Sequence, residues 1–178
     1  MSCKKNIVIT GFMGTGKTVV GKEVALKLGL EFLDTDEIIE KKQGCTISEI
    51  FNKKGEEYFR ELEQNVLVEL AKMSNSVIAT GGGTLLKNEN LELISTNGII
   101  FCLDANIDVL LKRLGKNMTR PLIAQKTNDD IIRLYEKRNE NYNRIPNHIY
   151  NSDISPLETA DTIIKLYNKL TAVSEKTE

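Results

Sequence analysis

The stretch GFMGTGKT, residues 11–18, decides the fold that the sequence predicts. It has the form G-x-x-x-x-G-K-[ST], follows a short β-branched run at residues 6–10, and opens a helical pattern over Lys17–Leu28. In that context glycines let backbone N–H groups curl around phosphate oxygens, and the lysine adds a positive point charge. The hydroxyl of Thr18 can bind Mg²⁺. The motif therefore predicts a nucleoside triphosphate site; the alternative is a glycine-rich turn with an incidental lysine.

Further short apolar runs alternate with helical patterns along the rest of the chain. They lie at Glu31–Asp34, 76–80, Gly98–Asp104 and 148–151. Such alternation is typical of an α/β protein whose parallel sheet is covered by helices on both faces. A length of 178 residues corresponds to one domain of this class, so we expect a single domain over residues 1–178.

Two segments break this alternation. Residues 37–62 hold more helical patterns than one connecting helix needs, and a longer helix pattern follows at about 56–73. We predict that residues 37–62 form an insertion that packs beside the sheet. Residues 113–127 are polar, contain a glycine and a proline, and show little periodicity. We predict that they form a mobile lid.

Composition and charge exclude several classes of partner. The chain has 24 basic and 25 acidic side chains and a formal net charge of −1, which argues against broad nucleic-acid or polybasic membrane binding. No apolar stretch approaches the ~18 residues of a membrane span. Three widely spaced cysteines fit free thiols in a reducing compartment. We expect a soluble cytoplasmic monomer, and we interpret the single histidine, His148, as a structural residue without a partner.

Two carboxylates, Asp34 and Asp36, follow the second predicted strand. Ligands of an open α/β sheet bind just outside the carboxyl ends of its strands. Alternation along an extended segment would point both side chains the same way. One carboxylate could then hold Mg²⁺ through water, and the other could take the proton of a substrate hydroxyl. The alternative is a turn with a helix N-cap.

Three consecutive glycines, Gly81, Gly82 and Gly83, follow the third predicted strand. Glycines permit unusual backbone angles and let main-chain N–H groups approach a ligand closely. We therefore predict a ligand-contacting loop, against the alternative of a merely flexible one.

Arginines are few, and three of them occupy informative positions. Arg138 lies between two tyrosines on the apolar stripe of a helix predicted at 128–145, and a guanidinium buried there needs an anion. Arg60 lies one turn before Glu63, which could orient it. For both arginines the anion is either a structural carboxylate or that of a substrate. Arg120, in the predicted lid, could reach the phosphates or remain a solvated charge.

The nucleotide motif alone does not distinguish a kinase from a GTPase. A GTPase would usually carry an N-K-x-D signature after a later strand. The nearest string, NKKG at residues 52–55, lies in the predicted insertion and lacks the aspartate. The sequence therefore favours a small-molecule kinase.

Taken together, the motifs resemble the shikimate kinase family. They are GFMGTGKT at 11–18, FLDTD at 32–36, FRELE at 59–63, GGG at 81–83, RPLI at 120–123 and YEKRNENY at 135–142. The resemblance implies a nucleoside-monophosphate-kinase-like fold, with a five-stranded parallel sheet in the order 2-3-1-4-5. It also implies Mg²⁺-dependent transfer of a phosphoryl group from ATP to the 3-hydroxyl of shikimate, in the pathway to chorismate and the aromatic amino acids.

The resemblance also implies residue roles. Asp36, Arg60, Gly82 and Arg138, with Gly81 and Gly83 beside them, resemble the shikimate contacts. Gly14, Thr15, Gly16, Lys17, Thr18 and Val19 would wrap the ATP phosphates, Arg120 would reach them from the lid, and Arg113 resembles the residue near adenine. Lys17, Asp36 and Arg120 would be the catalytic residues. Thr18 and Asp34 would serve Mg²⁺, the aspartate through water.

Some features depart from the family, and other functions stay open. The resemblance places the adenine loop at about Asp153–Pro156, where the family often has a basic residue nearby, whereas this chain reads NSD at 151–153. The alternatives are a gluconate kinase-like enzyme, an adenylate-kinase-like enzyme, and a P-loop module that binds nucleotide without catalysis.

Overall fold

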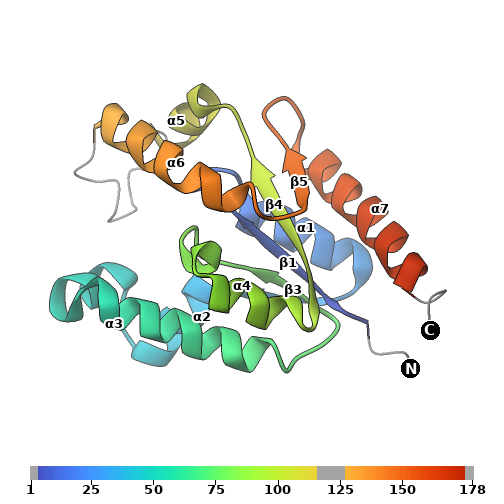
Figure 1. Cartoon of the computed structure of the whole chain (residues 1–178), viewed down its shortest axis with the longest axis horizontal. Coiled ribbons are helices and arrows are strands. Elements are labelled where there is room, and N and C mark those ends of the chain that lie inside the picture. Colours follow the sequence, from blue (N-terminus) through green and yellow to red (C-terminus); the bar gives the residue numbers. More distant parts are fainter. Residues whose placement is uncertain (1–3, 116–126, 175–178) are drawn as a thin grey trace.

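The computed structural model describes residues 4–115 and 127–174, and at its centre lies a five-stranded sheet in the order β2-β3-β1-β4-β5 (Figure 1). All four strand pairings are parallel. The strands are β1 Asn6–Gly11, β2 Glu31–Asp34, β3 Ser76–Ala79, β4 Gly98–Asp104 and β5 Asn147–Tyr150. The predicted order is confirmed, and each strand ends within one residue of its predicted bounds.

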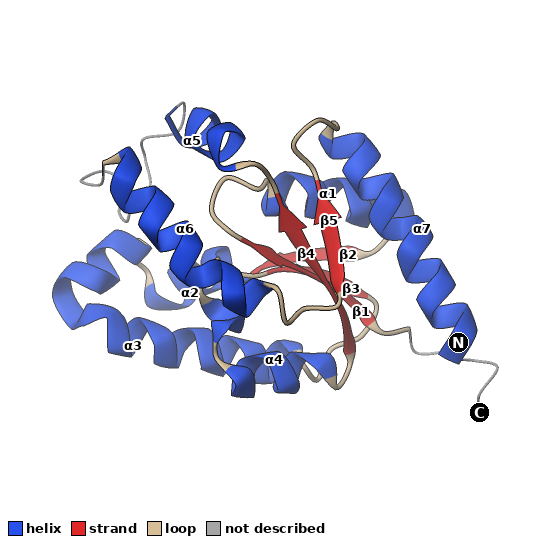
Figure 2. Cartoon of the chain, turned by 45° about the horizontal axis from the view of Figure 1, so that its top comes forward, coloured by secondary structure: helices blue, strands red, loops and turns tan. Residues whose placement is uncertain are grey.

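Helices cover both faces of the sheet (Figure 2). They are α1 Lys17–Leu28, α2 Thr35–Gln43, α3 Ile47–Leu70, α4 Asn88–Ser95, α5 Ile107–Gly115, α6 Asn128–Tyr142 and α7 Pro156–Ser174, with a short 3₁₀ turn, η1, at Thr84–Leu86. Helices α1 and α7 lie on one face, and α3, α4, α5 and α6 pack toward the other.

Alternation along the strands divides the core into two layers. Ile7 and Ile9 of β1 pack with Val24 of α1 and Ile163 of α7. Val8, between them, points to the opposite layer with α3 and α4. Because both faces of β1 are covered, all six of its residues are buried, which explains its nearly continuous apolar sequence.

The segment predicted as an insertion consists of α2 and the first part of α3. A capping box begins α3: the Thr46 hydroxyl accepts from the Glu49 N–H, and the Glu49 carboxylate accepts from the Thr46 N–H. Gly55 interrupts α3 with φ 80° and ψ 176°. The predicted bounds of 37–62 begin inside α2, which starts at Thr35, and end inside the part of α3 that follows Gly55.

The predicted lid begins inside a helix. Arg113, Leu114 and Gly115 are the last residues of α5, and Leu114 is buried in the core. The rest of the lid prediction, residues 116–126 with Arg120, lies outside the described residues. Helix α6 begins after the N-cap Thr127 and ends at Tyr142, three residues earlier than predicted. No helix among the described residues is long and apolar enough to cross a bilayer.

Candidate active site

The phosphate loop joins β1 to α1 and folds around its own lysine. Gly14 and Gly16 have φ of 84° and 87°, a left-handed conformation that favours glycine. The Lys17 ammonium donates to the carbonyl oxygens of Gly11, at 2.8 Å, and Phe12, at 3.0 Å. Lys17 is buried, with 7% of its surface exposed. The loop thus places a buried positive charge beside the N-terminus of α1, where anions are stabilised.

Thr18 and Asp34 lie side by side at the start of α1 and the end of β2. The Thr18 hydroxyl donates to Asp34 Oδ2 at 2.9 Å, and Asp34 Oδ1 accepts from the Asp36 N–H at 3.0 Å. Asp34 therefore caps α2 as well, so its two predicted roles are compatible in one geometry. A hydroxyl next to a carboxylate is the oxygen set that Mg²⁺ uses together with water and phosphates, and these two residues fit that ion.

The argument that placed Asp34 and Asp36 on one face of an extended segment is wrong. Strand β2 ends at Asp34, and Asp36 lies in the first turn of α2. Both side chains nevertheless line one pocket, because α2 begins at the edge of the sheet where the phosphate loop lies.

That pocket has a volume of about 450 Å³ and collects residues from distant parts of the chain. Among its lining residues are Lys17, Thr18, Asp34, Asp36, Arg60, Glu63, Gly81, Gly82, Gly83 and Arg138. The structure therefore brings together all the residues predicted to contact shikimate, with the lysine and threonine of the phosphate loop.

Arg60 is held by two carboxylates of its own helix. Its Nη1 donates to Glu63 at 2.5 Å and its Nη2 to Glu56 at 2.8 Å. Burial lowers the pKa of the Arg60 guanidinium, but the charges and hydrogen bonds of Glu63 and Glu56 outweigh it and raise the pKa above its usual value. Glu63 is fully buried and also accepts from the Thr84 hydroxyl. Arg60 thus keeps its charge at the pocket wall.

Residues 81–83 form the glycine loop, in which glycine is required by the lack of space and not by unusual backbone angles. None of the three glycines has a positive φ. A Cβ on Gly81 would lie 2.8 Å from Asp36 Oδ1 and from Thr84 Oγ1, and one on Gly83 would lie 2.8 Å from Arg60 Nη1. Any larger residue would therefore push into the carboxylate and the guanidinium of the pocket.

Tyr142 joins Arg138 to this loop, which sequence reasoning missed. Its hydroxyl donates to the carbonyl of Gly82 and accepts a hydrogen bond from Arg138. Burial raises the pKa of Tyr142 well above its usual value, so the hydroxyl stays protonated and remains a donor. The available signal was the spacing of four residues from Arg138, which places both side chains on one helix face.

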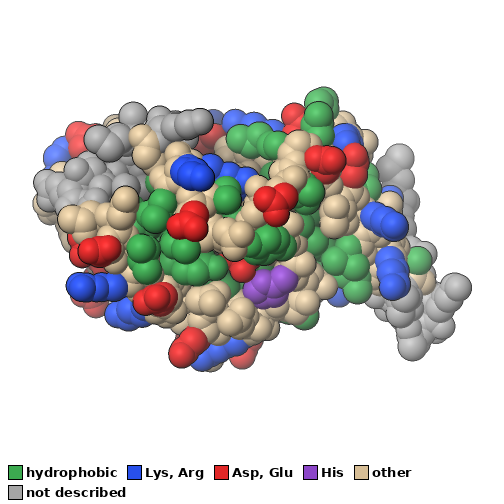
Figure 3. All heavy atoms as spheres, turned by 90° about the horizontal axis from the view of Figure 1, so that it is seen from above, with side chains coloured by type: hydrophobic (Ala, Val, Ile, Leu, Met, Phe, Trp, Pro, Cys, Tyr) green, Lys and Arg blue, Asp and Glu red, His purple; other side chains and the backbone are tan. Residues whose placement is uncertain are grey.

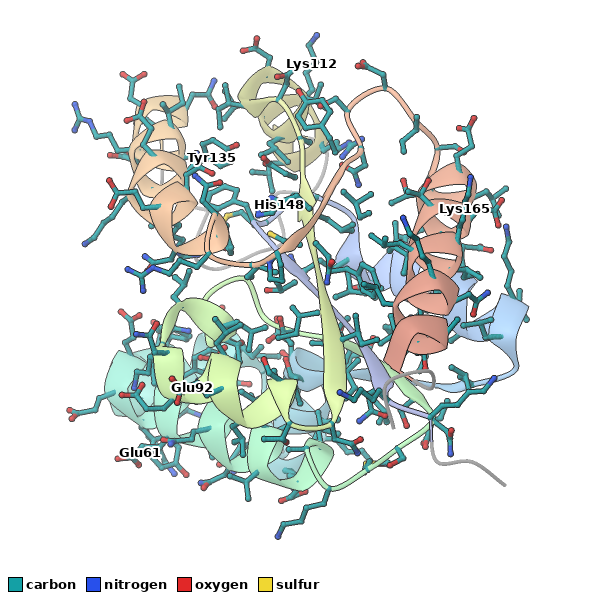
Figure 4. The ribbon with its side chains drawn as sticks, turned by 45° about the vertical axis from the view of Figure 1, so that its right-hand side comes forward. Glu61, Glu92, Lys112, Tyr135, His148 and Lys165 are labelled. Atoms are coloured by element: carbon teal, nitrogen blue, oxygen red, sulfur yellow. The ribbon has the colours of Figure 1, made fainter. Side chains whose placement is uncertain are left out.

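Two further contacts anchor α6. Tyr135 extends from α6 toward β4 (Figure 4), where its hydroxyl donates to Asp104 at 3.0 Å. Burial and the Asp104 carboxylate raise the pKa of Tyr135 to about 12. The prediction that His148 has no partner is wrong, because its Nε2 lies 2.9 Å from the Tyr142 carbonyl. The histidine is exposed, as Figure 3 shows, and supports the end of α6 from outside the pocket.

The phosphate loop also lines a second pocket, of about 210 Å³. Gly14, Gly16, Val19 and Arg113 line it together with Ile154 and Pro156 from the loop after β5. The flat guanidinium of Arg113 and the ring of Pro156 are surfaces on which a nucleobase can pack. Arg113 and the predicted adenine loop thus meet next to the phosphate loop, although 40 residues lie between Arg113 and Ile154 in the sequence.

The sheet order and the phosphate loop define a P-loop protein with the nucleoside-monophosphate-kinase-like fold. A family model described as shikimate kinase matches residues 13–168. This chain therefore belongs to the shikimate kinase family.

Individual relatives agree with this assignment. The chain is 42% identical to the shikimate kinase of Thermoanaerobacter pseudethanolicus over 93% of this chain and 98% of the relative. It is 45% identical to that of Thermodesulfovibrio yellowstonii, over 93% and 96%. The solved structure of shikimate kinase from Acinetobacter baumannii in complex with shikimate matches with a TM-score of 0.86 and 35% identity, over 98% of this chain and 96% of that one.

Proposed function

We propose that this protein transfers the γ-phosphoryl group of ATP to the 3-hydroxyl of shikimate, giving shikimate 3-phosphate and ADP. One observation carries the proposal. The larger pocket joins a phosphate-loop lysine and threonine to a carboxylate pair and to two arginines on its walls. This arrangement suits a phosphate donor on one side and a small acceptor that carries hydroxyls and a carboxylate on the other.

The phosphate loop would hold the donor. Backbone N–H groups at residues 14–19 and the Lys17 ammonium would neutralise the phosphate oxygens, whose charge shifts as the phosphoryl group leaves. Thr18 and, through water, Asp34 would hold Mg²⁺, which would neutralise charge on the phosphates. The 2.9 Å contact between the two side chains supports the pairing.

Asp36 would act on the acceptor hydroxyl. Its carboxylate lies in the pocket between the phosphate loop and the glycine loop, 2.8 Å from where a Cβ of Gly81 would be. A carboxylate there can orient a hydroxyl by accepting its hydrogen bond and can take its proton as the new bond to phosphorus forms. Phosphoryl transfer depends mainly on such positioning.

Arg60 and Arg138 would bind the carboxylate of shikimate. The two guanidinium groups reach the pocket from different helices, α3 and α6, and a carboxylate between them can accept charge-assisted hydrogen bonds from both. The glycine loop beside them would offer backbone groups to the ring hydroxyls. Because Glu63 and Glu56 already orient Arg60, little conformational freedom would be lost on binding.

The remaining parts of the proposal rest on the resemblance and on composition. Arg120 would reach the phosphates from a lid at about residues 113–127. We also propose a cytoplasmic monomer without a nucleic-acid or membrane partner, in keeping with a net charge of −1 and the free cysteines Cys45 and Cys102.

Release of ADP with shikimate, gluconate and AMP as separate acceptors tests the proposed function. We expect ADP release that depends on shikimate and on Mg²⁺, with the other two acceptors at the background rate. Faster turnover of gluconate or AMP would assign the pocket to another acceptor. Nucleotide binding without any acceptor-dependent release would indicate a non-catalytic P-loop module.

A further inference from the structure

The carbonyl groups of the phosphate loop are held by donors from the protein. Those of Gly11 and Phe12 accept from Lys17, and that of Gly16 accepts from the Val20 N–H at 2.9 Å. In a trans peptide the C=O and the next N–H point in opposite directions. Lys17 lines the pocket on the phosphate side, so the Gly11 and Phe12 carbonyls that it binds face that side. A carbonyl held on the opposite side of the loop instead turns the following N–H toward the phosphates.

The carbonyl of Thr15 is held by a residue from the far end of the chain. Asn151, directly after β5, donates from its Nδ2 to Thr15 O at 2.7 Å across 136 residues of sequence. Asn151 is 3% exposed, and its own N–H donates to the carbonyl of Asp104 at 2.8 Å. The sheet thus fixes the position of Asn151, and Asn151 in turn fixes the peptide between Thr15 and Gly16.

The same residue also holds the arginine of the smaller pocket. Arg113 donates from Nη2 to the Asn151 carbonyl at 3.0 Å and from Nη1 to Asn151 Oδ1 at 3.4 Å. Its Nη1 also lies 3.5 Å from the carbonyl of Gly14. Asn151 therefore contacts both predicted parts of the nucleotide site, the phosphate loop through its donor and the base-side arginine through its acceptors.

We propose that Asn151 is a positioning residue for nucleotide binding. Its hydrogen bond to the Thr15 carbonyl orients the Gly16 N–H toward the phosphates. Its contacts with Arg113 hold that guanidinium against the base. The proposal rests on the proposed function in one respect, that a nucleotide occupies these two places. It concerns nucleotide affinity alone, because Asn151 lines the smaller pocket and not the one in which the acceptor would bind.

The exchange Asn151→Asp tests this role, and Asn147→Asp is its matched control. The first keeps the shape of the side chain but replaces the donor facing Thr15 O with a carboxylate oxygen. Asn147 begins β5, the strand that ends just before Asn151; it donates from Nδ2 to the Ile100 carbonyl at 2.9 Å and lines neither pocket. Both variants thus lose one amide-to-carbonyl hydrogen bond at β5, and only one of the two bonds reaches the phosphate loop.

The measurement is the affinity for ADP with Mg²⁺ by titration calorimetry, together with the KM for shikimate and the free energy of unfolding. We expect Asn151→Asp to weaken ADP binding about tenfold or more, because the hydrogen bond is lost and a carboxylate oxygen then faces the Thr15 carbonyl oxygen. The KM for shikimate should be unchanged. We expect Asn147→Asp to bind ADP as the unsubstituted protein does. An equal loss of ADP affinity in both variants would overturn the proposal.

A second variant covers the case in which a buried carboxylate prevents folding. Asn151→Ser removes the amide without adding a charge, and its hydroxyl is too short to span the same distance. We expect about a fivefold loss of ADP affinity in this variant. Unchanged affinity in a folded Asn151 variant would overturn the role of Asn151. Failure of the unsubstituted protein to bind ADP would instead remove the proposed nucleotide site itself.

Discussion

Individual side chains in this pocket serve the fold and the ligand at once. Asp34 caps α2 and also contacts Thr18, while Glu63 is buried and holds both Arg60 and Thr84. Removing one partner of a buried charged pair leaves the other uncompensated, which destabilises the protein. The role of such a residue is therefore established by comparing the affinities for the two substrates, and not by activity alone.

Arg138→Ala should weaken shikimate binding while ATP binding survives, because Arg138 lines the acceptor side of the pocket. Loss of a charge-assisted hydrogen bond predicts a rise of about 10–100-fold in the KM for shikimate. Arg144→Ala is the control, since Arg144 is exposed, lines neither pocket, and donates from its guanidinium to Asn88 Oδ1 at 3.0 Å. Equal loss of both affinities in Arg138→Ala would show that the arginine is structural.

Tyr142→Phe should raise the KM for shikimate about fivefold and leave the KM for ATP unchanged. The reason is that the Tyr142 hydroxyl contacts both Arg138 and Gly82 and so fixes their relative positions. Tyr135→Phe is the matched control on the same helix, where the lost hydroxyl contacts Asp104. Steady-state kinetics measures both KM values in the two variants, and thermal unfolding compares their stability. The idea fails if the two phenylalanine variants change the KM for shikimate equally.

Helix α3 forms two walls of the pocket because it is bent. Ile47 and Phe51 line the pocket from the part before Gly55, and Phe59 and Arg60 line it from the part after. At φ 80° and ψ 176° the backbone of Gly55 occupies a region that residues with a Cβ rarely adopt. Glycine at this position lets the chain bend between the two helical parts of α3, around the space left for a ligand.

Gly55→Ala should lower the free energy of unfolding by about 1–3 kcal/mol because alanine is strained at this positive φ. A clash does not contribute, since the new Cβ would meet no atom of the described residues within 4 Å. The control is Gly115→Ala, in which the new Cβ likewise meets no atom of the described residues within 4 Å and the backbone has no positive φ. Urea unfolding of both variants gives the comparison. A Gly55→Ala protein as stable as the control would show that the bend relaxes at no cost.

The sequence predicted the molecule well wherever the signal is local. Strand bounds came within one residue because short apolar runs end at glycine or at polar residues, and Lys17–Leu28 was predicted with its observed bounds. The sheet order followed from the resemblance and not from periodicity. Part of the pocket could be assembled from sequence because the phosphate loop, the aspartates and the three glycines follow the carboxyl ends of the neighbouring strands β1, β2 and β3.

Contacts between distant segments could not be predicted from local patterns. The bonds from Asn151 to Thr15 and from Tyr142 to Gly82 join residues 136 and 60 positions apart. A single asparagine in a loop, or a tyrosine on an apolar stripe, gives no sign of such a partner. The extended geometry assumed for Asp36 was wrong for a related reason. Asp34 caps α2, so the helix begins at Thr35 and already includes Asp36.

The most direct test of the central claim is a competition among acceptors in one vessel. The protein receives limiting ATP with equal concentrations of shikimate, gluconate and AMP, and ³¹P–¹H NMR identifies the phosphorylated product and the position of its phosphate. The proposed function predicts shikimate 3-phosphate as the product. A phosphate on another hydroxyl of shikimate, or on gluconate or AMP, would contradict it.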